Sequence, residues 1–372
     1  MVLLLCLLLQ ATAPIKVADK GKVPSLAIDA DGNVYVAFSR GGNIEVAIST
    51  DGGATFGAPV RALNVQGRDP GSPARPPRIA VDNQKRIYVS GPLCLAPPDQ
   101  SVVNDIYYTV SADKGKTWKG PYLVSEAKTG VESAHAAAAG PGDLHVAWLS
   151  GDGTKPPVLA YSRFGADGKR TGKATIVAKT PCERCPPAVT VDGKGNPWVA
   201  YRETGKENRA VWLATSTDGG KTFTSSKLNS VETGITDCPA ESPALAVTSD
   251  GKTLAAAWMD LRSIEHDPNV FWSYGPPGKL SRDTDPHDDR RYGQRRPTLA
   301  VEPDGTVWCA WEDGRLSTQR IFYASTKESA NFALGTDKEG GCFAPSLAAG
   351  GGKVGVAYQS GDLVAFRLLA PK

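Results

Sequence analysis

The sequence predicts an all-β protein, a β-propeller made of four-stranded antiparallel blades. Three observations lead to this fold class: a hairpin pattern recurs along the chain, further strand patterns follow each copy, and the spacing of the copies suits one blade. The composition agrees, because 40 Gly and 28 Pro supply the turns that many short strands require.

The recurring unit is an apolar strand, a turn rich in Gly and Asp, and a second strand rich in β-branched and aromatic residues. Clear copies read PSLAIDADGNVYVAF from Pro24 and PTLAVEPDGTVWCAW from Pro297, and a weaker copy begins at His135. Equivalent second-strand positions are Val36, Val89, Val146, Val199, Ala256, Cys309 and Val356. Neighbours in this series are 47 to 57 residues apart, which is typical of a propeller blade and predicts seven of them.

The two ends of the chain predict how the ring closes. The seventh copy ends after its third strand, DLVAFRLL from Asp362, and so lacks a fourth strand. The segment PIKVAD, residues 14–19, precedes the first copy and has no hairpin partner of its own. We expect this N-terminal strand to complete the last blade, because closure removes exposed sheet edges. Six blades, with the C-terminal segment packed differently, is the alternative.

The first 13 residues, MVLLLCLLLQATA, form an apolar run that ends in small residues. This pattern is typical of a secretory signal peptide, and the run is too short to span a bilayer; an uncleaved anchor is the alternative. We expect residues 1–13 to be the signal, residues 14–372 to be a single propeller domain, and the protein to be secreted or periplasmic. We expect no membrane span beyond that signal.

The charge is nearly balanced, with 42 basic and 39 acidic residues and a net charge of +3. Such a balance gives no basis for a nucleic-acid partner. We expect a monomer that requires no cofactor.

Three blades share one turn between their third and fourth strands, with the pattern S-x-D-x-G-x-T-[WF]. It reads STDGGATF from Ser49, SADKGKTW from Ser111 and STDGGKTF from Ser216, while STKESANF from Ser325 is a decayed copy. This pattern is the Asp box. Through it the chain resembles the sialidase superfamily of Asp-box (BNR repeat) propellers, including uncharacterised bacterial proteins labelled exo-α-sialidase.

The chemistry of the Asp box is structural. Its Asp accepts hydrogen bonds from the N–H groups of the turn, its Gly supplies a positive φ, and its aromatic residue packs between sheets. We therefore interpret Asp51, Asp113 and Asp218 as turn residues rather than catalytic acids.

The resemblance implies a ligand face formed by the loops that precede first strands and follow second strands. Sialidases hold the substrate carboxylate with arginines and use a Tyr nucleophile together with a Glu and an Asp. On this basis the candidate substrate-binding residues are Arg202, Arg262 and Arg315, and the candidate catalytic residues are Tyr292, Asp260 and Glu312. The motif W-x-D-x-R at 258–262 and 311–315 has another interpretation, a loop brace in which Asp pairs with Arg and Trp packs.

One motif of working sialidases is missing. Their N-terminal R-I-P arginine has no counterpart in the first strand, and PPRIAVD around Arg78 resembles it only superficially. We therefore expect an exported sialidase-like propeller that binds, and could hydrolyse, a glycan or another anionic ligand on its top face. If it is an enzyme, it is a glycoside hydrolase of the exo-α-sialidase type. The alternative is a non-catalytic binding or scaffold propeller for a protein or polymer partner.

The cysteines cluster before first strands. Cys182 and Cys185 form C-x-x-C before one blade, and Cys238 precedes the next blade. Because disulfides are the default in exported proteins, and because similar bacterial propellers share this arrangement, we expect Cys238 to pair with Cys182 or Cys185. A thiolate-rich metal site that includes His135 is the alternative, although our expectation is that no metal binds. Cys309 aligns with buried valines and predicts a core thiol.

An acidic segment, DTDPHDD at residues 283–289, offers oxygen ligands of the kind that Ca²⁺ prefers. Its spacing lacks the order of an EF-hand loop. We interpret it as a solvated insert.

Overall fold

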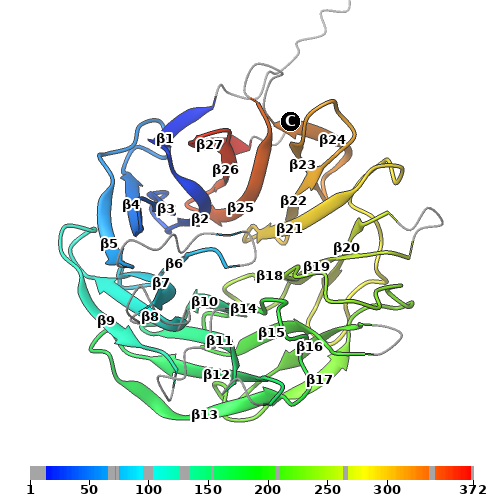
Figure 1. Cartoon of the computed structure of the whole chain (residues 1–372), viewed down its shortest axis with the longest axis horizontal. Coiled ribbons are helices and arrows are strands. Elements are labelled where there is room, and N and C mark those ends of the chain that lie inside the picture. Colours follow the sequence, from blue (N-terminus) through cyan, green and yellow to red (C-terminus); the bar gives the residue numbers. More distant parts are fainter. Residues whose placement is uncertain are drawn as a thin grey trace, which may run out of the picture.

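The computed structural model describes residues 14–65, 72, 75–94, 104–125, 134–151, 155–205, 209–262, 267–334 and 340–369. The expected signal peptide, residues 1–13, lies outside them. The described residues form seven antiparallel sheets arranged as blades around a central axis (Figure 1). The predicted seven-bladed propeller is confirmed, and the six-bladed alternative is wrong. None of the described segments is a helix long and apolar enough to cross a membrane.

Each blade runs outward from the axis in chain order. The innermost strands are β2 (Lys22–Ile28), β6 (Arg78–Val81), β10 (His135–Ala139), β14 (Ala188–Val191), β18 (Ala244–Val247), β21 (Gln294–Val301) and β25 (Cys342–Gly350). The second strands are β3 (Val34–Arg40), β7 (Ile87–Cys94), β11 (Leu144–Ser150), β15 (Pro197–Arg202), β19 (Leu254–Asp260), β22 (Val307–Asp313) and β26 (Lys353–Ser360).

The outer half of each blade continues this order. The third strands are β4 (Asn43–Ser49), β8 (Asn104–Ser111), β12 (Val158–Phe164), β16 (Val211–Thr215), β20 (Asn269–Gly275), β23 (Arg320–Ser325) and β27 (Leu363–Leu369). The outermost strands are β5 (Val60–Asn64), β9 (Lys119–Leu123), β13 (Arg170–Ala178), β17 (Thr224–Lys227), β24 (Glu328–Leu334) and β1 (Ile15–Asp19). We number the blades 1 to 7 from β2–β5 onward, so that blade 7 contains β25–β27 and β1.

The ring closes as the sequence predicts. Strand β1 pairs antiparallel with β27, with Ile15 opposite Phe366 and Asp19 opposite Leu363. The N-terminal strand thereby becomes the fourth strand of blade 7, beside the C-terminal strands (Figure 1). This pairing covers an edge that would otherwise be open to strand addition.

Two blades depart from the repeat. In blade 5 the fourth strand is reduced to a bridge, in which the N–H of Trp272 donates to the carbonyl of Thr284 at 2.9 Å. The segment that leads into this bridge contains two consecutive prolines, which have no N–H to continue a ladder. In blade 6 the decayed Asp box forms a tight turn, with Ser325 opposite Glu328.

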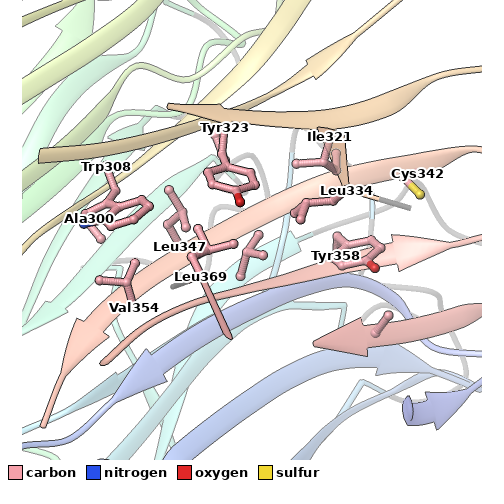
Figure 2. Close-up of a cluster of buried hydrophobic side chains, with 13 residues drawn as sticks. Ala300, Trp308, Ile321, Tyr323, Leu334, Cys342, Leu347, Val354, Tyr358 and Leu369 are labelled. Atoms are coloured by element: carbon pink, nitrogen blue, oxygen red, sulfur yellow. The ribbon is translucent and has the colours of Figure 1, made fainter. Parts of the chain in front are cut away.

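The core lies between blades rather than at one centre. Between blades 6 and 7, Trp308 and Tyr323 face Leu347, Val354 and Tyr358 (Figure 2). Comparable apolar clusters join the other neighbouring blades. Since each buried large side chain contributes about 1.5–3 kcal/mol, the blades hold one another in place, and the loops at the axis rest on a rigid frame.

The Asp boxes tie down the outer turns. In the third box, the N–H and Oγ1–H of Thr222 donate to the two carboxylate oxygens of Asp218 at 3.0 and 2.6 Å. Ser216 donates to the same carboxylate, and its Oγ accepts the N–H of Gly220 at 2.8 Å. Equivalent bonds form around Asp51 and Asp113, and those from Thr117 and Ser111 lower the pKa of Asp113 to about 2.

The glycine of the box meets a specific spatial need. Gly220 has φ +88°, and a Cβ there would lie 2.1 Å from the ring of Tyr161 on blade 3. The box aromatic, Phe223, packs edge-on against that same ring, with 5.1 Å between centroids. The box is therefore an inter-blade contact, and it lies on the face opposite the loops described next.

Candidate functional site

A cavity of about 240 Å³ opens at the mouth of the axial channel. Residues at or near the N-terminal ends of all seven inner strands line it, so it lies on the face where the sequence predicts a ligand. We call it the axial pocket. Its polar side chains are of two kinds: hydroxyls that bind neighbouring strands, and a small set of charged groups.

The hydroxyl groups connect adjacent inner strands. Ser25 Oγ accepts the N–H of Ile79 at 3.2 Å, and Ser346 Oγ accepts the N–H of Leu26 at 3.0 Å. These bonds satisfy backbone N–H groups that point toward the axis and away from any partner in the strand ladder. The charged groups are therefore the ones available to a ligand.

Arg78, the first residue of β6, lines this pocket. Its Nε donates one long hydrogen bond to the carbonyl of His135, at 3.4 Å. No carboxylate pairs with Arg78 among the residues that the structure describes. Burial lowers the pKa of Arg78 to about 10, and the group is still a cation near neutral pH. The pocket thus contains a guanidinium that lacks an anion.

A carboxyl group lies in the same pocket. Glu241 is buried, and burial raises its pKa even though Arg296 and Arg295 oppose this. Arg295 Nη1 lies 3.8 Å from Glu241 Oε1, too far for a direct hydrogen bond. Arg296 instead binds Glu312, at 2.6 Å, and Glu312 also accepts the N–H of Ala344 at 2.7 Å.

The backbone around the pocket is strained. Val23, Arg296 and Ala344 have φ values of 49°, 51° and 51°, in the left-handed region that non-glycine residues rarely adopt. Each precedes a proline, and the strand register shifts at each. Strain of this kind costs about 1–3 kcal/mol per residue and clusters at functional sites. Here it surrounds the pocket on three neighbouring blades.

The first W-x-D-x-R loop is a brace. Arg262 donates through Nε and Nη2 to the carboxylate of Asp260, at 3.0 and 2.5 Å, and through Nη1 to Asp283. Trp258 Nε1 donates to Asp260 at 3.1 Å. The guanidinium lies 4.0 Å from the centroid of the Phe271 ring. The guanidinium of Arg262 is therefore already bound by two carboxylates and stacked near one aromatic ring.

The second W-x-D-x-R loop repeats this arrangement one blade later. Arg315 donates to Asp313 at 3.0 and 2.8 Å and through Nη1 to Asp288, and Trp311 Nε1 donates to Asp313 at 2.9 Å. Its guanidinium lies 4.3 Å from the Phe322 centroid. The bracing interpretation of the motif therefore describes the contacts of both loops.

The acidic insert supplies the second half of each brace. Asp283 binds Arg262 and Asp288 binds Arg315, although these partners lie 21 and 27 residues apart in sequence. The other insert acids pair locally, Asp285 with Arg290 and Asp289 with Arg291. The insert is thus an ion-paired strap, and Asp283 in it is buried rather than solvated.

The predicted catalytic residues do not form one constellation. Asp260 belongs to the first brace, and Glu312 lies beside the axial pocket with Arg296. Tyr292 lies in an exposed loop with its ring 5.7 Å from Arg291, and in the described part of the chain no hydrogen bond joins it to the other two.

The third predicted arginine is fully buried. Arg202 donates to the carbonyls of Arg209 and Met259, at 2.8 and 2.6 Å. Within the described ranges it forms no ion pair, and its Nε has no hydrogen-bond partner. Burial lowers the pKa of this group, and the nearby carboxylates of Asp260 and Glu241 oppose that shift.

The three candidate cysteines converge beside Arg202. The sulfurs of Cys182 and Cys185 lie 2.8 Å apart, and those of Cys238 lie 3.0 and 3.6 Å from them. All three are thiols in this structure, and the disulfide expected among them remains a prediction. His135 is elsewhere, because its Nε2 binds Ser90 Oγ at 3.0 Å. Hydrogen bonds from the neighbouring thiols lower the pKa of Cys238.

Cys309 is buried among apolar side chains of blades 5 and 6, which confirms the predicted core thiol. The side chain of Cys94 lies outside the described residues.

Arg78 and Glu241 are the pocket residues that the sequence did not single out as a site. A usable signal for Arg78 was present, since an arginine begins the inner strand of blade 2 in PPRIAVD. Its significance depends on the missing carboxylate, which only the three-dimensional arrangement reveals.

The sequence matches the family described as BNR repeat-like domain over residues 96–313. No curated protein sequence matches the chain. The match includes two of the Asp boxes and the first W-x-D-x-R loop, and it ends within the second loop, before Arg315.

The fold is similar to several solved propellers. The Trypanosoma rangeli sialidase in complex with the inhibitor DANA superposes with a TM-score of 0.53 and 14% identity, over 84% of this chain and 56% of that one. The chain thus spans just over half the length of that sialidase. Penicillium chrysogenum alpha-L-arabinanase complexed with arabinobiose gives 0.54 and 13%, over 96% and 98% of the two chains. A protein of unknown function from Dyadobacter fermentans gives 0.52 and 14%, over 98% and 99%.

Proposed function

The chain belongs to the BNR repeat-like family, and from this premise we propose that it binds a small anionic ligand, a carboxylate-bearing sugar, in the axial pocket. The observation that carries the proposal is the Arg78 guanidinium, which faces the pocket without a carboxylate partner in the described structure. A guanidinium fork matches a carboxylate in a bidentate manner.

The electrostatics of the pocket favour an anion. Arg78 is partly buried and has no carboxylate partner among the described residues, so an incoming carboxylate would supply a charge that they do not. In Arg262 and Arg315, by contrast, protein carboxylates already take this role. Of the arginines discussed, Arg78 is therefore the one prepared for a ligand that enters the channel mouth.

The size of the pocket limits the ligand. A cavity of about 240 Å³ is smaller than most drug-sized sites, so we infer a single sugar unit or the terminal unit of a glycan. The likeness of the fold to a sialidase and to an arabinanase complexed with arabinobiose favours a sugar over other small anions.

Binding tests the proposal directly. Calorimetric titration with N-acetylneuraminate and with glucuronate should show binding that a neutral hexose does not reproduce. Arg78→Ala should weaken the affinity by about 10- to 100-fold, because charge-assisted hydrogen bonds contribute about 1.5–3 kcal/mol. Arg78→Lys should lie between the two, since lysine keeps the charge and loses the fork.

Arg61→Ala is the matched control, because Arg61 is an exposed arginine on the outer strand β5. It should bind as the unaltered protein does. Equal affinities for Arg78→Ala and Arg61→Ala would reject the axial pocket as the site.

Glycoside hydrolysis is the second candidate, and the buried Glu241 carboxyl is the observation that favours it. Its raised pKa suits a group that donates a proton to a leaving oxygen. Such activity would fall as the pH rises through that pKa, because the acid form is lost.

A fluorogenic aryl sialoside tests hydrolysis separately from binding. Turnover that Glu241→Gln abolishes, while affinity for the free sugar is retained, would establish a hydrolase. Binding without turnover across the pH range would leave a sugar-binding propeller.

A further inference from the structure

The three clustered thiols form a second feature, independent of the axial pocket. Cys182 and Cys185 lie in the loop before β14, and Cys238 lies in the segment before β18. These inner strands are neighbours in the ring, and the N–H of Cys182 is fixed by the carbonyl of Arg202 at 2.8 Å. Two rigid blades therefore hold the sulfurs within 3.6 Å of one another.

A single disulfide does not account for this geometry. Any pairing would join two sulfurs and leave the third sulfur in contact with the bond but outside it. All three pairs are instead in contact, at 2.8, 3.0 and 3.6 Å, so the arrangement is that of three ligands directed at one point. Three convergent ligands are the arrangement that a metal ion uses.

The surroundings favour thiolates. Arg209 Nη1 lies 3.4 Å from Cys182 Sγ and 3.3 Å from Glu183 Oε2. Arg202 is buried nearby and has no carboxylate partner among the described residues. Asp260 and Glu241 act on Arg202 only through space, so thiolates beside it would add negative charge next to a buried guanidinium.

We propose that Cys182, Cys185 and Cys238 bind one thiophilic d¹⁰ metal ion, Zn²⁺ or Cu⁺, as three thiolates. Three thiolates with Zn²⁺ carry one negative charge, and with Cu⁺ they carry two. The guanidinium groups of Arg202 and Arg209 lie beside the cluster and would offset part of this charge, although Glu183 also pairs with Arg209. Soft thiolate ligands select these two ions over harder divalent cations.

The coordination would remain open on one side. Among the described residues the cluster contains no histidine or carboxylate, so a tetrahedral ion would complete its shell with a water or an external ligand. Cys238 is the partly exposed member and marks the open side. With Zn–S bonds of about 2.3 Å, tetrahedral thiolates lie about 3.8 Å apart, so the sulfurs must separate by about 0.2–1 Å.

Metal titration of the full chain tests the proposal. The protein is purified under anaerobic reducing conditions, stripped with a chelator, and titrated with Zn²⁺ or Cu⁺ against a coloured competitor. We expect one ion to bind per chain for at least one of the two metals, and their relative affinities identify the preferred metal. Co²⁺ substitution should produce the near-ultraviolet charge-transfer band of thiolate ligation.

Matched variants assign the ligands. Cys185→Ser should lose binding, whereas Cys309→Val should retain it, because the equivalent position in most other blades is valine. Arg209→Gln leaves all three sulfurs in place. It should lower the affinity for the metal ion by about tenfold, because one positive charge beside the thiolates is lost. This variant keeps the test decisive should Cys185→Ser fold poorly.

Two results would overturn the proposal. The first is that the unaltered chain, reduced and folded, binds neither ion, and that the folded Cys309→Val variant also binds neither. The other is alkylation and mass spectrometry of protein purified without reductant that finds one free thiol and one disulfide in this cluster and no bound metal.

Discussion

The arginines at the channel face divide into two groups. Arg262 and Arg315 are saturated by protein carboxylates and stacked on rings, whereas Arg78 and Arg202 have no carboxylate partner in the described structure. The first group carries its partner within its own motif, since W-x-D-x-R places the Asp two residues before the Arg. The second group has no such local partner. The difference separates arginines that stabilise loops from arginines that remain available to an external anion or a charged ligand set.

The largest expected effect concerns the first brace. Arg262→Ala would leave the buried carboxylates of Asp260 and Asp283 without their cation, and removing one partner of a buried ion pair costs about 3–5 kcal/mol. Denaturant unfolding measures the loss. Arg262→Lys should lose less, because it keeps the charge. Arg315→Ala should also lose less, because its second partner, Asp288, is 57% exposed. An Arg262→Ala protein as stable as the unaltered chain would contradict the bracing role.

The next effect concerns pH. His287 is a buried residue of the insert and packs against Trp311; its two ring nitrogens have no hydrogen-bond partner among the described residues, and burial lowers its pKa. The unfolded chain protonates this histidine near pH 6.5 and the folded chain resists protonation, so stability should fall as the pH drops below about 6.5.

The slope of this loss is at most about 1.4 kcal/mol per pH unit for one group. The measurement is the unfolding midpoint between pH 7.5 and 5, taken for the unaltered chain and for His287→Phe. The phenylalanine variant should lose this part of the slope. Identical slopes in both proteins would show that His287 binds protons equally in the folded and unfolded chains, and would contradict the lowered pKa.

A smaller effect concerns the opposite face. Asp218→Asn removes a charged acceptor from the third Asp box, which we expect to lower the thermal midpoint by less than Arg262→Ala does, because the turn is solvent-exposed. Ligand affinity should not change, since the box lies away from the axial pocket. A change in ligand affinity without a change in the thermal midpoint would place the ligand on the Asp-box face and would contradict the axial site.

The smallest effect concerns Arg78. Arg78→Ala removes a desolvated cation that has one long hydrogen bond, so we expect the free energy of unfolding to change by about 1 kcal/mol or less. Guanidinium unfolding curves of the variant and of Arg61→Ala should nearly overlap. A loss of unfolding free energy comparable with that of Arg262→Ala would show that Arg78 braces the structure as Arg262 does.

The sequence predicts the frame of this molecule better than its chemistry. The hairpin repeat and the spare strand at residues 14–19 specify seven blades and their closure, because periodic apolar patterns report local geometry. The convergence of Cys182, Cys185 and Cys238 was also accessible, since all three precede neighbouring inner strands. What was not accessible is pairing over distance: nothing local links Asp283 to Arg262, and nothing local shows that Arg78 lacks an acid.

Parallel measurement of ligand affinity in Arg78→Ala and Arg315→Ala tests the central distinction most directly. We expect Arg78→Ala to lose carboxylated-sugar binding by about 10- to 100-fold with its unfolding midpoint nearly unchanged, and Arg315→Ala to keep the affinity while its midpoint falls. The reverse result, in which Arg315→Ala loses affinity and Arg78→Ala does not, would show that the braced loops form the ligand site and would contradict the account.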